Sequence, residues 1–144
     1  MPEDSKRPND EMNLDLINMV QNARMQHDDD AIPSQVPGVY WIEAKRKTGG
    51  YPAPTPTSGE WQIVTDVDHV DQQWATVKQA TERGQLGHKS KVSTQPAHNQ
   101  AHQEARLICV RTYNADDADD VARIQAALLD LGFRDVNLSY MRDK

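Results

Sequence analysis

Two hydrophobic periods alternate along the chain in a fixed order from residue 60 onward. Alternating runs rich in aromatic and β-branched residues predict strands, and apolar residues three and four apart predict helices. The predicted strands lie at 60–65, 89–94, 106–112 and 135–141, and the predicted helices begin at Asp66 or Asp68 and at Asp116 or Asp117. The order strand–helix–strand–strand–helix–strand is a split β-α-β arrangement, an antiparallel sheet with both helices on one face.

Both predicted helices have an apolar stripe and a glycine at the end. The stripes are Val70, Trp74, Val77 and Thr81 in the first helix, and Val121, Ile124, Leu128 and Leu131 in the second. Gly84 and Gly132 follow the stripes at the position where a left-handed residue usually ends a helix. These apolar positions are therefore the predicted helical part of the core, together with Trp61.

The residues before 60 add one strand and an N-terminal segment. Residues 39–45 are rich in aromatic and β-branched residues and predict a strand that extends the sheet. Residues 48–59 hold three prolines and three glycines and predict a loop. We therefore expect an α+β domain at 39–144, with a curved antiparallel sheet. We assign 1–38 to a tail with a linker and an amphipathic helix at 10–25, which would serve as a tail, a strap or a protein-binding helix.

Composition limits the functional classes. A chain of 144 residues has room for one domain, and its net charge of −6 argues against binding duplex DNA. Cys109 is the single cysteine, so no intramolecular disulfide can form, which is typical of a reducing compartment. The amino terminus lacks the apolar segment of a signal peptide, and no run approaches the ~18 apolar residues of a membrane span. We therefore expect a cytoplasmic protein that does not bind membranes.

Positive charge is concentrated in one stretch, 83–111. This stretch has five of the sixteen Lys and Arg residues but only one of the twenty-two acidic residues. Strand alternation places Lys89, Lys91 and Arg111 on the side of the sheet opposite the helices, which we call the open face, and Trp41 on the same side. Two cations beside an aromatic ring would suit a phosphorylated small molecule or a nucleotide. The alternative is a solvated edge, with Trp41 packed under the N-terminal helix.

Other motifs favour structural explanations. His98 and His102 are four residues apart, but Asn99 stands where a zinc protease has glutamate, so no metal site is predicted. No glycine-rich phosphate loop is present, and no cofactor is expected. Cys109 lies among aliphatic residues of a strand, which favours a buried and unreactive thiol.

Five segments resemble, in order, the Bles family. They are G-E-W-Q-I-V (59–64), V-D-x-x-W (70–74), G-Q-L-G-H-K-S-K-V-S-T (84–94), L-I-C-V-R-T-Y (107–113) and L-S-Y-M-R-D-K (138–144). Members of this family are uncharacterised, are often labelled phosphothreonine lyase domain proteins, and are related in fold to the cap-binding translation initiation factor 4E. The resemblance covers roughly 40–144 and implies a curved antiparallel sheet backed by helices.

The resemblance also suggests functional residues and one alternative activity. Lys91, Arg111, Arg142 and Lys144 correspond to recurrent cations of the family, whereas Glu60 replaces a usual lysine. Relatives continue beyond Lys144, so we expect any pocket to lack an edge strand or lid.

In the lyase alternative, Lys91 would remove the α-proton of phosphothreonine, His88 would act as the acid, and Arg111 and Arg142 would hold the phosphate. Arg142 has the alternation of Leu138, so it would reach the open face only through a bulge or turn. The third alternative is a structural or partner-binding protein that uses the helix at 10–25.

Overall fold

A computed structural model describes residues 31–36, 40–96 and 104–143 of the chain. The predicted helix at 10–25, His98, His102 and Lys144 lie outside these ranges. The elements are the 3-10 turn η1 (Pro33–Gln35), β1 (Trp41–Lys45), β2 (Gly59–Asp66), α2 (Val70–Glu82), β3 (Lys89–Ser93), β4 (Ala105–Thr112), α3 (Ala118–Asp130), the 3-10 turn η2 (Asp135–Asn137) and β5 (Leu138–Arg142).

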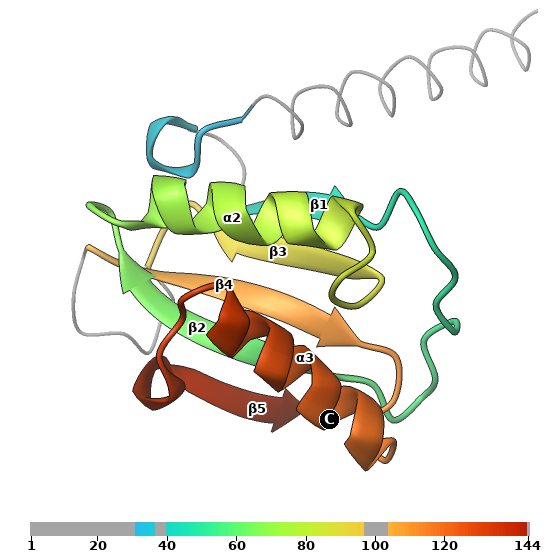
Figure 1. Cartoon of the computed structure of the whole chain (residues 1–144). Coiled ribbons are helices and arrows are strands. Elements are labelled where there is room, and N and C mark those ends of the chain that lie inside the picture. Colours follow the sequence, from blue (N-terminus) through green and yellow to red (C-terminus); the bar gives the residue numbers. More distant parts are fainter. Residues whose placement is uncertain (1–30, 37–39, 97–103, 144) are drawn as a thin grey trace, which may run out of the picture. The chain divides into compact units, whose positions relative to one another are not determined.

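The strands form one antiparallel sheet in the order β1-β3-β4-β2-β5. Both helices cover the same face of this sheet, and the other face lies behind it in Figure 1. The predicted α+β class and the β-α-β-β-α-β order are therefore confirmed. The early strand extends the sheet as expected, because β1 pairs with β3 at the edge.

The core lies between the helices and the sheet. Its largest fully buried apolar side chains come from both layers and from the turn between α2 and β3: Ile42, Ile63, Val70, Trp74, Val77, Leu86, Val92, Ile108, Val110, Ile124 and Leu128. Trp61 is also buried, and its indole nitrogen donates to the backbone oxygen of Val121 in α3 at 2.9 Å. The predicted core roles of Trp61 and Trp74 are thus confirmed, whereas Val121 and Leu131 are only half-buried.

Polar contacts set the helix ends. Asp117 is the N-cap of α3, and its carboxylate accepts from the backbone N–H of Asp120 at 3.1 Å, which satisfies an otherwise unpaired donor. Gly84 and Gly132 follow the two helices with φ of +79° and +102°. Glycine adopts such positive φ angles with less steric strain than other residues do. The prediction that Asp66 or Asp68 caps α2 was wrong by three residues or by one, because the N-cap is His69.

The last strand begins later than predicted. Residues Asp135–Asn137 form η2, and β5 runs from Leu138 to Arg142. The 3-10 turn leaves Val136 with 86% of its surface exposed, so the valine does not belong to the strand pattern that predicted it. Alternation alone cannot separate such a turn from the first residues of a strand.

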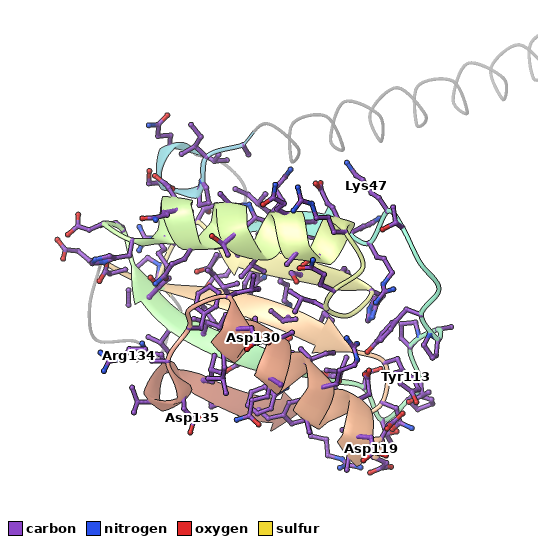
Figure 2. All side chains as sticks on the ribbon, in the orientation of Figure 1. Lys47, Tyr113, Asp119, Asp130, Arg134 and Asp135 are labelled. Atoms are coloured by element: carbon purple, nitrogen blue, oxygen red, sulfur yellow. The ribbon has the colours of Figure 1, made fainter. Side chains whose placement is uncertain are left out.

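Hydrogen bonds fix the proline-rich loop between β1 and β2 to the start of α3. The backbone N–H of Thr55 donates to the Tyr113 oxygen at 2.9 Å, and the Thr57 hydroxyl donates to the Asn114 side chain at 2.6 Å. Tyr113 and Asp119 mark this end of α3 in Figure 2. At the other end of the loop the Tyr51 hydroxyl donates to Asp120 of α3 at 2.5 Å, so the loop is held on both sides of the exposed Pro52 and Pro54.

Candidate functional site

Residues directly opposite each other on neighbouring strands share a face of the sheet, so the register defines the open face. One row across it consists of Glu43, Lys91, Cys109, Gln62 and Ser139. A second row includes Arg111 and Glu60, which are also directly opposed. The predicted position of Lys91 and Arg111 on the same face is therefore confirmed, while their role in binding stays a prediction.

Lys91 and Arg111 lie diagonally across β3 and β4. Lys91 opposes Cys109, and Arg111 is two residues further along β4. Such diagonal neighbours are about 7–8 Å apart, a distance that two long side chains can close around one anion. The Lys91 ammonium nitrogen lies 4.3 Å from the centre of the Trp41 ring, a cation–π contact. Trp41 and Lys91 therefore form the first part of the site.

Arg111 forms the second part, and it holds two carboxylates. Its Nη1 donates to Glu60 Oε1 at 3.0 Å and to Asp143 Oδ1 at 2.9 Å, and its Nη2 donates to Asp143 Oδ2 at 2.5 Å. The side chains of Arg111 and Glu60 are only 15% and 11% exposed, whereas that of Asp143 is 40% exposed. The guanidinium is thus supported from within by Glu60 and holds Asp143 at the surface.

Glu60 is ionised despite its burial. Burial raises its pKa, but hydrogen bonds from Gln62, Cys109 and Arg111 outweigh this effect, so the pKa lies below its usual value. The hydrogen bonds that Arg111 donates to Asp143 raise the pKa of Arg111 above its usual value. Burial of the guanidinium lowers the pKa in part, and the hydrogen bond to Glu60 raises it further. Arg111 therefore stays positively charged at any physiological pH.

Cys109 is fully buried beneath this network. Burial, together with the neighbouring Glu60 carboxylate, raises the pKa of the thiol well above its usual value. The thiol is therefore neutral near pH 7 and a poor nucleophile. The prediction of a buried cysteine is confirmed, and the side chain contributes packing and a hydrogen bond to Glu60.

The other predicted cations are placed less favourably. Lys89 is on the open face and pairs with Glu43 at 3.3 Å. Arg142 pairs with Asp116 of the loop before α3. It lies directly opposite Gly59 of β2, a position that faces the same side of the sheet as Trp61. Its guanidinium therefore lies on the helix side, away from Lys91.

His88 is engaged at the end of the sheet near the proline-rich loop. Its ring stacks on Tyr51 with centres 6.1 Å apart, and Tyr51 donates to Asp120 of α3 at 2.5 Å. The Nδ1 atom of His88 is buried without a hydrogen-bond partner. Burial, followed by the charges of Arg111, Lys89 and Arg46, lowers the pKa of His88, so the ring is neutral near pH 7.

Glu60 and Asp143 are the two site residues that the sequence analysis did not assign. Glu60 was noted only as the loss of a cation, although the alternation of Trp61 and Ile63 toward the core already places Glu60 on the open face. Asp143 lies beyond the predicted strand at 135–141, so the sequence analysis did not assign the direction of its side chain. Its backbone N–H donates to the Ser58 oxygen at 2.9 Å, which continues the register of β5.

Two cavities open beside the N-terminal end of α2, with volumes of about 210 and 380 Å³. They share His69 and Gln73 at the start of α2, and further lining includes Gln72, Thr76 and Asn137. These side chains are mainly uncharged and offer no cluster of cations. The open face is therefore the better candidate for an anionic ligand.

The described part of the chain contains neither a group of three metal-binding side chains nor a helix able to cross a membrane. Within residues 31–36, 40–96 and 104–143, no three His, Cys, Asp or Glu side chains are grouped to hold a metal ion. None of the helices in these ranges combines the length and the apolar character that crossing a bilayer requires.

Comparison with known protein families shows to which family the chain belongs. The family model described as basophilic leukemia-expressed protein Bles03 matches residues 54–141, more than half of the chain. The chain belongs to the Bles03 family. The range matched to Bles03 includes Glu60, Lys91 and Arg111, whereas Trp41 and Asp143 lie outside it. A comparison with curated proteins found no match.

Proposed function

We propose that the protein binds a phosphorylated ligand with a flat ring, such as a nucleotide, on the open face of its sheet. The proposal rests mainly on the bidentate contact between Arg111 and Asp143. In this contact the guanidinium, which is also bonded to buried Glu60, holds an anionic group at the surface. A phosphate presents the same pair of oxygens to an arginine as a carboxylate does. The position of the Asp143 carboxylate is therefore the position we assign to the phosphate.

Lys91 and Trp41 would serve the rest of the ligand. The Lys91 ammonium lies over the Trp41 ring and is close enough to Asp143 to contribute to its lowered pKa, to which the hydrogen bonds from Arg111 contribute most. A ligand ring that stacks on Trp41 would displace Lys91 from the indole and leave the ammonium for the phosphate. Both cations would then contact the same anionic group.

The proposal is limited to binding. Elimination of phosphate from phosphothreonine needs a base and an acid that reach the same substrate. His88, the predicted acid, stacks on Tyr51 with its Nδ1 buried, and Arg142, part of the predicted clamp, pairs with Asp116. These contacts favour a binding face over a lyase site.

A titration followed by backbone NMR at low salt tests the proposal. We expect 5′-nucleoside monophosphates to shift signals of β3 and β4 around Lys91 and Arg111, and Lys91→Gln to weaken binding about tenfold or more, since a hydrogen bond to a charged group contributes about 1.5–3 kcal/mol. Lys78→Gln is the matched control, because Lys78 pairs with Glu82 on α2. Absence of any shift with phosphorylated compounds at millimolar concentration would refute the proposal.

A further inference from the structure

Asp143 occupies the position on Arg111 that a bidentate anion would take. Its two carboxylate oxygens accept from Nη1 and Nη2 of Arg111 at 2.9 and 2.5 Å. The neighbouring ion pair of Arg142 with Asp116, on the other face, and the backbone bond from Asp143 to Ser58 hold this end of β5 in place. Asp143 is therefore a tethered competitor for any anion that approaches Arg111.

The two carboxylates on Arg111 differ in how easily they can leave. Glu60 has an 11% exposed side chain and also accepts from Gln62 at 2.7 Å, so its release would leave buried polar groups unpaired. The Asp143 side chain is 40% exposed, and water can solvate its carboxylate after release. Asp143 is thus the partner that a ligand would replace.

We infer that Asp143 is a specificity-determining residue that selects dianionic phosphate monoesters over phosphodiesters and carboxylates. The inference rests on the proposed function. A tethered group competes at an effective concentration in the millimolar range. A monoanion that displaces Asp143 exchanges one negative charge for another and gains little. A phosphate monoester brings a charge of about −1.5 to −2 at pH 7, and Lys91 is placed to neutralise the additional charge.

Three small probes and one substitution test the inference. The probes are phenyl phosphate, methyl phenyl phosphate and benzoate, which share a ring and differ in charge and in the anionic group. Their affinities are measured by NMR titration at pH 7.5 and low salt for the whole chain and for Asp143→Asn. Asp119→Asn serves as the matched control, because Asp119 is exposed on α3 at the helix side of the sheet.

The unmodified chain should bind the monoester at least tenfold more tightly than the diester or benzoate. Asp143→Asn should bind the diester and benzoate about tenfold more tightly than the unmodified chain does, so its preference for the monoester should be smaller. Asp119→Asn should change neither the affinities nor this preference. Monoester binding to the unmodified chain should also weaken as the pH falls below about 6, where the phosphate becomes a monoanion.

Equal binding of monoester and diester, or affinities that do not respond to Asp143→Asn, would overturn the role of Asp143 and leave the proposed binding face intact. Failure of all three probes and of the nucleoside monophosphates to bind either the unmodified chain or Asp143→Asn would overturn the binding face itself, and the selectivity with it. The backbone NMR spectrum of Asp143→Asn will show directly whether the variant is folded.

Discussion

Replacement of Arg111 by methionine tests the ion network of the open face most directly. The substitution keeps most of the apolar stem of the side chain but leaves Glu60, with 11% of its side chain exposed, without its guanidinium partner. Removal of one partner from a buried ion pair costs about 3–5 kcal/mol. We expect a loss of about 2–3 kcal/mol in the free energy of unfolding at pH 7, because Glu60 keeps its hydrogen bond from Gln62 and Asp143 returns to water.

The loss of stability caused by Arg111→Met should become smaller as the pH falls. In the unmodified chain the pKa of Glu60 is lowered, so its stabilising contribution is present above the unfolded value of about 4.3 and is lost as the pH falls through the folded pKa. In Arg111→Met, burial without the guanidinium raises the folded pKa, so the penalty is present at pH 7 and is relieved as the pH falls. The difference between the two proteins should therefore narrow from pH 7 to pH 4.

Urea unfolding at both pH values, followed by tryptophan fluorescence, measures this difference. Asp143→Asn is the comparison, since it removes the exposed partner of the same guanidinium and should cost no more than about 1 kcal/mol. If Arg111→Met loses less than about 1 kcal/mol and the loss is the same at pH 7 and pH 4, Glu60 is solvated and the account of a buried support for Arg111 is wrong.

Two further predictions concern backbone packing and histidine ionisation. A Cβ at Gly87 would lie 1.8 Å from a backbone carbonyl oxygen of β4, so Gly87→Ala should lower the free energy of unfolding by about 1–3 kcal/mol. Gly50→Ala is the control, because nothing lies within 4 Å of its Cβ, and its free energy of unfolding should stay within about 1 kcal/mol of that of the unmodified chain. Equal urea midpoints for the two variants would contradict this prediction. In an NMR titration His88 should have a pKa below about 6.5, because burial and nearby cations disfavour its charge, and His69 a raised one, because of its bond to Asp66; the reverse order would contradict the assignment.

Most of the fold follows from patterns that act over short distances. Alternating runs placed β2, β3 and β4 within a residue of their observed bounds, and the apolar stripe predicted four of the five buried residues of α2, all except Ala80. Asp135–Asn137 was the exception, since its alternating residues form a 3-10 turn. Whether a polar residue caps a helix also depends on local geometry, which explains why His69 rather than an aspartate precedes α2.

The candidate site could be predicted only in part. Alternation is enough to place Lys91 and Arg111 on one face, because both belong to regular strands. It gives no information about which acid reaches which cation. Asp143 contacts Arg111 from 32 residues away in sequence, and Glu60 does so from 51 residues away, so both pairs depend on the strand order. Residue spacing does not encode that order.

The fixed ends of the proline-rich loop have a practical consequence for labelling. Pro52, Ala53 and Pro54 are exposed, while the residues on either side are bonded to α3 and to the end of β4. A fluorophore or affinity handle attached at Ala53 would sit on a short bridge whose two ends are anchored. The movement of such a label relative to the sheet would therefore be restricted.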